Sequence, residues 1–520
     1  MSARTKAAQA DEQFRTALVL VQAGETSRAM RLLDRALTFD ARHKGVRNAL
    51  GVLRLESGDA AGAIRLLKPL ARDVPDAAGI QLNLGNALVA AGRASEAIVP
   101  LKRATTLDPN STLAWYGYAR GLQIAGRVED AEPVYRHVLQ SAPTHVETRA
   151  NLAAVLNFLD RYTESEAEAR EALRLAPAHA GAHVNLAVSL LAQHRWAEGW
   201  AEYEWREKTS LLDGQRRAWE KPQWEGEALN GRTVLVHAEQ GFGDTLQFVR
   251  YLPRLRALGA RVVLQVPGSL EALLRAANVA DQVVPYRDVL PLHDLQIPLT
   301  SLPHRLQCAT DAQVYQSGAP YLAPLFDRAA ALAGAATGRA ETPSGAARTV
   351  LRVGIVWAGS GTHVNDMHRS CGLDALTPLF NTANVEWVSL QNGARAADLA
   401  AVTPTLSSDV RAALHVVDIG TAFNDFAETA AVVASLDAVV SVDSAVAHLA
   451  GALGVPCWLL LPRVGLDWRW AGDALPADGS VGSGWYGSVW GVRQETAGDW
   501  SAPVERLRVA LGELVAGVRL

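Results

Sequence analysis

Small and apolar positions recur with one fixed spacing from the N-terminus to residue 209. Three columns of residues are each separated by 34 positions: Gly24, Gly58, Gly92 and Gly126; Pro75, Pro109, Pro143 and Pro177; and Ala29, Ala63, Ala97, Ala131, Ser165 and Gly199. Glycine permits the left-handed turn between two helices, and proline stops the helix that precedes it. The pattern therefore predicts pairs of antiparallel helices that touch at the small residues.

An apolar stripe accompanies these columns and gives each helical pair a face to bury. Its leucines share a further repeat position, which Arg54 interrupts, and they are Leu20, Leu88, Leu122, Leu156 and Leu190. Six units fit the spacing, beginning at residues 10, 44, 78, 112, 146 and 180. The pattern resembles the tetratricopeptide repeat, a helix-turn-helix unit of about 34 residues. This resemblance implies an α solenoid over residues 1–209 whose concave groove binds a protein or peptide; the alternative is a spacer or an arm that forms a homo-oligomer.

Three asparagines, Asn83, Asn151 and Asn185, share one repeat position beside the packing leucines. A row of side-chain amides can hydrogen-bond an extended backbone. In the repeat superhelix of the O-linked N-acetylglucosamine transferases, which this region resembles, asparagines at this position bind the acceptor polypeptide. Gly117 interrupts the series, and solvated polar side chains are the other interpretation.

After Gly231 the pattern changes to short β-branched runs that alternate with helix-length segments, which is typical of parallel βαβ units. The runs are Thr233–His237, Arg261–Val266, Gln282–Pro285, Leu351–Trp357, Val385–Leu390, His415–Asp418, Ala438–Val442 and Cys457–Leu461. They predict two Rossmann-like α/β domains, at 210–330 and 349–520, joined by an Ala-, Gly- and Thr-rich linker at 331–348. Ligands of such domains bind beyond the carboxyl ends of the strands.

The loop after the first predicted strand reads Glu239-Gln240-Gly241-Phe242-Gly243-Asp244 and leads into a helix. Its glycines permit close approach of a ligand to the backbone. A nicotinamide-type dinucleotide fingerprint is disfavoured, because Leu246 stands where the third glycine is needed. Asp244 is placed either to cap the helix or to point into the space between the two domains.

Two further loops carry candidate ligand-binding residues. Asp443 and Ser444 lie at a strand-to-helix turn, with His448 one turn later, where free helix amides suit an anionic or hydroxylated ligand. A helix cap and a buried core histidine are the alternatives. The loop after the first strand of the last domain gathers glycines and cations, the composition of a pyrophosphate cradle or of a solvated surface loop. Its candidate residues are His363, Asn365, Arg369 and Ser370, and Gln391, which ends the predicted strand Val385–Leu390, is a candidate for contact with the base or ribose of a nucleotide whose pyrophosphate this loop would hold.

These motifs together resemble the heptosyltransferase-like enzymes of glycosyltransferase family 9, in the versions fused to tetratricopeptide repeats, over residues 231–500. The match rests on Gly243-Asp244-Thr-Leu and on Ser441-Val-Asp443-Ser444 with His448. It implies a GT-B fold closed by a helix at Ala502–Leu520, with Asp244 as general base and the second motif holding a nucleotide-sugar donor. Ala445 and Ser444 depart from the family pattern and leave the identity of the donor open.

The sequence thus predicts an inverting glycosyltransferase that moves a sugar from a nucleotide-sugar donor to a hydroxyl of a protein docked by the repeats. Because the chain contains no Asp-x-Asp triplet, metal-independent transfer is expected, with no metal and no other cofactor. One alternative is a non-catalytic repeat scaffold with a degenerate nucleotide-sugar domain. Another is a heptosyltransferase that acts on a glycan or lipopolysaccharide acceptor.

The composition of the chain bears on its possible partners, its metal and disulfide content and its location. The chain is 49% apolar and 20% charged, as globular proteins are, and its net charge of −4 gives no reason to expect nucleic acid as a partner. The cysteines Cys308, Cys371 and Cys457 are odd in number and lack zinc-type spacing, so disulfides and a zinc site are not expected. The N-terminus lacks a signal peptide's apolar core, and no apolar run approaches the length of a bilayer span. A cytoplasmic protein without a membrane span is predicted.

Overall fold

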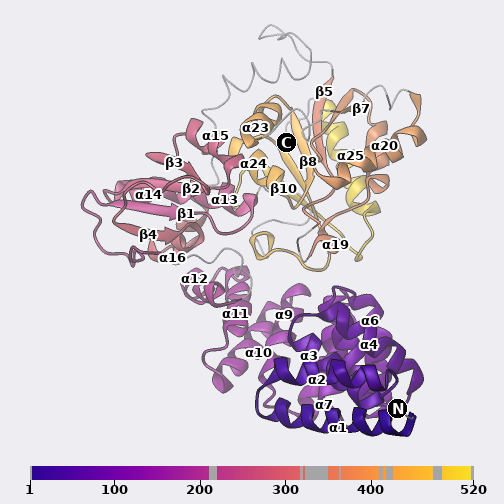
Figure 1. Ribbon diagram of the computed structural model, residues 1–520. Coiled ribbons are helices and arrows are strands. Elements are labelled where there is room, and N and C mark those ends of the chain that lie inside the picture. The colour runs from indigo at the N-terminus through magenta and orange to yellow at the C-terminus, as the bar shows by residue number, and fades with distance from the viewer. Residues whose placement is uncertain are drawn as a thin grey trace. The chain divides into compact units, whose positions relative to one another are not determined.

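The computed structural model describes residues 3–209, 219–316, 320–322, 350–361, 363, 365–408, 411, 414–416, 425–471 and 483–516. The predicted linker at 331–348 lies outside these residues. The chain divides into two compact units (Figure 1). The first comprises Met1–Leu156 with Ala167–Pro177, and the second comprises Asn157–Glu166 with Ala178–Leu520.

The predicted helical pairs are confirmed. They are α1 (Ala3–Gln22) and α2 (Thr26–Phe39), α3 (Lys44–Glu56) and α4 (Ala60–Asp73), α5 (Ala78–Ala90) and α6 (Ala94–Leu107), α7 (Thr112–Ile124) and α8 (Val128–Ser141), α9 (Val146–Phe158) and α10 (Tyr162–Leu175), and α11 (Ala180–Ala192) and α12 (Trp196–Tyr203). From α3 onward, the first helix of each pair begins at the residue that the 34-residue spacing marks. The reason is local, because each helix start is set by the turn and the helix stop that precede it.

The turn between the two helices of a pair explains the glycine column. Gly24, Gly58, Gly92 and Gly126 all have positive φ, between 72° and 86°. The same turn position is filled in the last two pairs by Asp160 (φ 58°) and His194 (φ 57°). Asp160 pairs with Arg463 and Arg493 within the second unit. The glycine column therefore ends where the turn residue gains a side-chain contact.

The second unit contains two parallel sheets, which Figure 1 shows as separate lobes. The sheet of the first lobe has the order β3-β2-β1-β4, with β1 (Thr233–His237), β2 (Arg261–Val266), β3 (Gln282–Pro285) and β4 (Leu295–Pro298). The first three strands match their predicted bounds. The strand β4 was not predicted, because it is short, ends in proline and follows β3 without an intervening helix.

The sheet of the second lobe has the order β10-β9-β8-β5-β6-β7. Its strands are β5 (Leu351–Val356), β6 (Val385–Ser389), β7 (Leu414–Val416), β8 (Ala438–Val442), β9 (Cys457–Leu461) and β10 (Val489–Arg493), of which β10 was not predicted. β5 is first in sequence but lies between β6 and β8, so the strand order reverses there and the loops after β5 and β8 leave adjacent strands. The predicted closing helix is α25 (Ser501–Val515).

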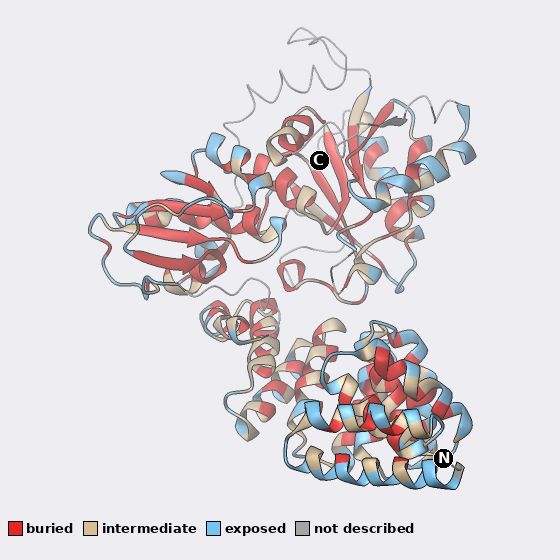
Figure 2. Cartoon of the chain, viewed as in Figure 1, coloured by how far each residue is buried: buried red, intermediate tan, exposed pale blue. Residues whose placement is uncertain are grey.

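The last helical pair shares its core with the α/β lobes. Trp196, Trp200 and Tyr203 of α12 are at most 8% exposed, and Figure 2 colours parts of this helix as buried. The ring of Trp200 contacts Phe248 in the first lobe and Trp468 in the second. Because these aromatic side chains join both lobes, α11 and α12 fall in the second unit, whereas the sequence analysis placed a domain boundary at 209. Among the described residues, no helix is long and apolar enough to cross a membrane.

Candidate active site

Asp244 lies in α13 (Phe242–Phe248), which follows β1, and its carboxylate makes two charge-assisted contacts. Oδ2 accepts a hydrogen bond from the Gly241 amide at 3.0 Å, so the residue caps its own helix. Oδ1 accepts a hydrogen bond from Nη2 of Arg469 at 2.5 Å, across the junction of the two lobes. The side chain remains 23% exposed. Asp244 therefore serves as a helix cap and also faces the second lobe.

Arg469 was not among the predicted site residues. It lies in the 3-10 helix η10 (Trp468–Trp470) after β9 and is 5% exposed. Its guanidinium donates to both carboxylate oxygens of Asp467, at 3.1 and 3.2 Å, and to Oε1 of Gln247 at 2.7 Å. It stands in the run Asp467-Trp468-Arg469-Trp470, which the sequence marks by its aromatic residues as a stretch that either flanks a donor or fills a domain seam.

Gly243 brings α13 against α24 (Ala445–Leu453), and the two helices lie side by side in Figure 1. A Cβ atom at Gly243 would lie 2.7 Å from Cδ2 of His448, too close for any larger residue without a shift. His448 is 6% exposed and its Nδ1 hydrogen-bonds the hydroxyl of Tyr486 at 3.0 Å. Burial lowers the pKa of His448 to about 3, so the ring is neutral at physiological pH. The predicted histidine thus packs against the predicted glycine loop.

Asp443 and Ser444 follow β8 and lead into α24. Ser444 is the N-cap residue, and its Oγ lies 3.0 Å from Oγ of Ser441. Among the described residues, no side chain caps the first amides of this nine-residue helix. Oδ1 of Asp443 lies 3.9 Å from Nε2 of His448. The turn therefore combines the N-terminus of α24 with the carboxyl group of Asp443, whose side chain is 17% exposed.

The ionisation of Asp443 gives a testable pH dependence. Burial, reinforced by the Asp467 carboxylate, raises the pKa of Asp443 to about 6, against about 3.9 in an unfolded chain. The folded chain then holds a proton that the unfolded chain has released, so this group lowers stability as pH rises from about 4 to about 6. Asp443→Asn is expected to match the native chain near pH 4 and to exceed its free energy of unfolding by up to about 3 kcal/mol above pH 6. Urea unfolding between pH 4 and 7 measures this, and a difference independent of pH contradicts it.

Gln391 supports the loop after β5. Its Oε1 accepts hydrogen bonds from the amides of Trp357 and Ala358, at 3.0 and 2.9 Å. Its Nε2 donates to the carbonyls of Ala358 and Asn392. Because both side-chain N–H groups are used, the structure gives Gln391 a role in fixing the loop backbone, and its predicted contact with a base or ribose stays a prediction.

The same loop holds the four residues predicted to bind pyrophosphate. Oγ of Ser370 accepts from the Gly359 amide at 3.0 Å and donates to Asp366. Nδ2 of Asn365 donates to the carbonyl of Gly465 at 2.5 Å, and this side chain is 7% exposed. The exposed His363 accepts the Asn365 amide at Nδ1.

The polar atoms of this loop that are buried without a hydrogen-bond partner among the described residues include Oδ1 of Asn365 and Nε of Arg369. Nε of Arg369 lies 3.6 Å from the Asp366 carboxylate, and its guanidinium lies against Gly359. Buried groups of this kind cost free energy unless a partner satisfies them. The loop therefore retains one acceptor and one cationic donor that a ligand could satisfy.

The three predicted loops form one electrostatic neighbourhood. Burial is the main cause that lowers the pKa of His448, and the charge of Arg369 lowers it further; the same charge opposes the rise that burial causes in the pKa of Asp443. Burial and Arg369 lower the pKa of His363, and Asp244 opposes that change. The fold thus brings the predicted base close to the predicted donor-binding residues.

Among the described residues, no group of three or more His, Cys, Asp or Glu side chains could hold a metal ion.

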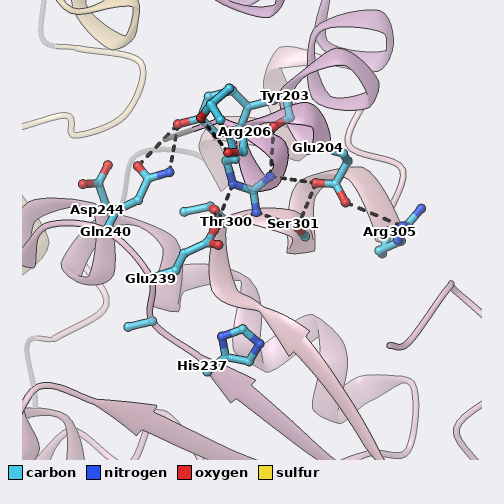
Figure 3. Close-up of polar contacts among 12 residues, drawn as sticks. Tyr203, Glu204, Arg206, His237, Glu239, Gln240, Asp244, Thr300, Ser301 and Arg305 are labelled. Carbon is cyan, nitrogen blue, oxygen red and sulfur yellow. Dashed lines mark hydrogen bonds and ion pairs between the residues drawn. The ribbon is translucent and has the colours of Figure 1, made fainter. Parts of the chain in front are cut away.

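Glu239 and Gln240 face the last helical pair (Figure 3). Glu239 is 7% exposed and pairs with Arg206 of the 3-10 helix η1 (Glu204–Lys208). The amide of Gln240 hydrogen-bonds the hydroxyl of Tyr203. These partners were not predicted, because they lie at the end of the repeat region, more than thirty positions before Glu239 and Gln240 in the chain.

The repeat asparagines lie on the first helices of their pairs. Asn83 on α5 donates to Oδ1 of Asn48 at 3.0 Å, and Asn151 on α9 donates to the hydroxyl of Tyr116 at 3.1 Å. Each amide thus bonds a side chain of the preceding pair. Asn185 lies on α11 in the second unit and accepts at its backbone carbonyl from Asn157. Binding of a peptide by the three asparagines stays a prediction.

Comparison with known proteins identifies the repeat region. Protein FlbA of Caulobacter vibrioides is 25% identical over 345 residues, covering 61% of this chain and 53% of that protein. The chain therefore spans about half the length of this curated relative. Among solved structures, YrrB, described as a tetratricopeptide-repeat protein with an unusual peptide-binding site, is 20% identical with a TM-score of 0.30, covering 33% of this chain and 88% of its own. TTC0263, a tetratricopeptide-repeat protein of Thermus thermophilus, is 24% identical with a TM-score of 0.30, covering 35% of this chain and 99% of its own.

The family model of the tetratricopeptide repeat matches residues 20–82 and 54–121, so the helical pairs of the N-terminal region are tetratricopeptide repeats.

Proposed function

We propose that the second unit is a GT-B glycosyltransferase of the heptosyltransferase-like kind, which moves a sugar from a nucleotide-sugar donor to an acceptor hydroxyl. One observation carries the proposal. The carboxylate of Asp244 in the first lobe accepts a hydrogen bond from Arg469 in the second lobe at 2.5 Å, and the neighbouring Gly243 packs against His448 of α24, the helix that begins after Ser444. A carboxylate that opposes cations and free helix amides suits the transfer of a group that leaves with a diphosphate.

The second lobe supplies the groups that would hold the donor. Arg369 offers a partly unsatisfied guanidinium, and the N-terminus of α24 offers amides directly after Ser444. Two negative phosphates gain from both kinds of donor, because the helix dipole and a guanidinium favour anions. Stabilisation of the leaving diphosphate by these groups would need no metal, which is the scheme we propose.

The first lobe supplies the base. Burial raises the pKa of Asp244, and the positive charge of Arg469 opposes that rise. A carboxylate accepts about four hydrogen bonds, so its two contacts leave lone pairs for a hydroxyl proton. Removal of that proton while the hydroxyl oxygen attacks the anomeric carbon breaks the bond to the diphosphate and inverts the configuration. The released diphosphate carries the displaced electron pair.

The repeats supply the docking surface in this proposal. Tetratricopeptide repeats present a concave face lined by first helices, where Asn83 and Asn151 lie. An asparagine amide has two N–H donors and a carbonyl acceptor, so one bond to the preceding pair leaves capacity for a peptide backbone. We therefore propose a protein or peptide acceptor.

The test begins with donor binding. A panel of sugar nucleotides is screened by thermal shift with the native chain and with Arg369→Gln, and intact-mass analysis then follows transfer to candidate protein and glycan acceptors. We expect one donor class to raise the Tm of the native chain, a clearly smaller rise in the variant, and transfer in the presence of EDTA. Donor binding without transfer to any acceptor supports a scaffold instead. Transfer to a glycan alone contradicts the protein acceptor, and no stabilisation by any sugar nucleotide contradicts the proposal as a whole.

A further inference from the structure

Arg206 enters the α/β region from the end of the last helical pair and is 1% exposed. Its Nε and Nη2 donate to Oε1 of Glu239 at 3.0 and 2.7 Å, and Nη2 also donates to Oγ of Ser301 at 2.7 Å. Thr300 donates its hydroxyl to the same oxygen of Glu239, and Nη1 of Arg206 donates to Glu204 at 3.0 Å. Figure 3 shows the guanidinium at the centre of these contacts. A residue of the repeat region thus fixes the side chain of Glu239.

A second contact fixes the next residue of the loop. The hydroxyl of Tyr203 lies 3.0 Å from Nε2 of Gln240, which precedes Gly241. Gly241 in turn donates its amide to the carboxylate of Asp244. Two side-chain anchors, at Glu239 and Gln240, therefore connect the last helical pair to the loop, whose Gly241 amide caps the carboxylate of the proposed base.

The chemistry of these anchors is informative. Burying a guanidinium and a carboxylate costs several kcal/mol of desolvation, and apolar residues often stabilise such positions equally well. The preceding helix α12 already has apolar anchors in Trp196 and Trp200. A buried fork between Arg206 and Glu239 fixes the direction of the loop in a way that an apolar contact does not, because its hydrogen bonds are directional.

We infer that Arg206 and Tyr203 are positioning residues for the Asp244 carboxylate, so that the last tetratricopeptide pair is part of the catalytic lobe. The inference rests on the proposed function for its catalytic consequence and on the contacts above for its structural part. The two parts therefore have separate measurements.

The sharpest variant is Tyr203→Phe, which removes only the hydroxyl and keeps the ring contacts with Trp200 and Trp468. Tyr251→Phe is its control, because that buried hydroxyl donates to the carbonyl of Val314, away from the loop. We expect Tyr203→Phe to lower kcat about tenfold or more with KM for the donor unchanged, since a displaced catalytic group costs up to about 100-fold. The pH profile of kcat should shift only in this variant.

Arg206 is tested by a graded series. Arg206→Gln removes the charge, whereas Arg206→Lys keeps it without the fork. We expect kcat to fall in the order native, Lys, Gln, with partial rescue by lysine. Arg352→Lys is the control. Arg352 lies near the amino end of β5, where its side chain pairs with Glu386 of β6. This control should leave kcat unchanged.

Hydrogen exchange of residues 238–246, followed by mass spectrometry, tests the structural part without any activity. Both Tyr203→Phe and Arg206→Lys should raise exchange in this segment, and the two controls should not. Unchanged exchange overturns the inference, whatever the activity. Raised exchange with unchanged kcat and pH profile also overturns it. If the native chain transfers no sugar, the proposed function fails, and the exchange measurement alone decides whether these residues position the loop.

Discussion

Asp244→Asn is expected to abolish most sugar transfer while the chain stays folded and still binds its nucleotide-sugar donor. A positioned general base contributes about 10² to 10⁴ in rate, and asparagine cannot accept the hydroxyl proton. The measurement is kcat for transfer, together with the donor Kd by calorimetry. Donor binding is expected to be retained because the residues proposed to hold the diphosphate lie in the other lobe.

This variant has a close match for its structural effects. Asp281 in the same lobe also accepts one backbone amide, that of Val262 at 2.7 Å, and one guanidinium, that of Arg256 at 2.8 Å. Asp281→Asn should therefore cost a similar free energy of unfolding, about 1 to 2 kcal/mol, and leave kcat unchanged. Full transfer activity in Asp244→Asn would discard the proposed base. An equal loss of activity in both variants would assign the effect to the stability of the lobe.

A chain that begins at residue 210 is expected not to fold, whereas a chain that begins at residue 157 is expected to fold. The shorter chain loses Trp196, Trp200 and Tyr203, which are 3%, 1% and 8% exposed. An aromatic side chain buries about 150–250 Å², worth about 4 to 6 kcal/mol each as an upper estimate. Their sum rivals the whole stability of a domain, about 5 to 15 kcal/mol.

Circular dichroism and thermal unfolding of both truncated chains check this prediction. The longer chain keeps every residue of the second unit, including the turn residue Asp160 with its partners Arg463 and Arg493. It is therefore the chain in which to ask whether the first unit docks the acceptor. We expect it to bind the donor and to lose transfer to a protein acceptor. A folded and active chain from residue 210 would remove the last helical pair from the catalytic lobe.

Much of the fold follows from local patterns. The spacing of glycine and proline predicts where the helices begin, because a residue with positive φ and a helix stop act on their immediate neighbours. Five strands of the α/β lobes lie within the predicted bounds to the residue, since a β-branched run encodes its own extended conformation. The strand β4 and the packing of α11 and α12 with the α/β lobes were not predicted, because a short strand and a shared aromatic core depend on distant partners.

For the candidate site, too, the sequence predicted the positions of residues but not the side chains that contact them. The sequence placed Asp244, Asp443 and Arg369 at strand ends, and parallel strands collect their loops at one edge of a sheet. It did not give their partners. Arg469 lies 225 positions after Asp244 in the chain, and Arg206 lies 33 positions before Glu239. No local pattern relates residues at such separations.

The sequence by itself determined the repeats, the two parallel sheets and the loops on which the candidate residues lie. Only the tertiary structure decided that the last helical pair packs with the α/β lobes, that Gly243 meets His448, and that Asp244 faces a guanidinium. The physical reason is that turns and strands are set by neighbours along the chain. The electrostatic environment of a carboxylate, by contrast, is set by whichever side chains the packed core brings within a few ångströms of it.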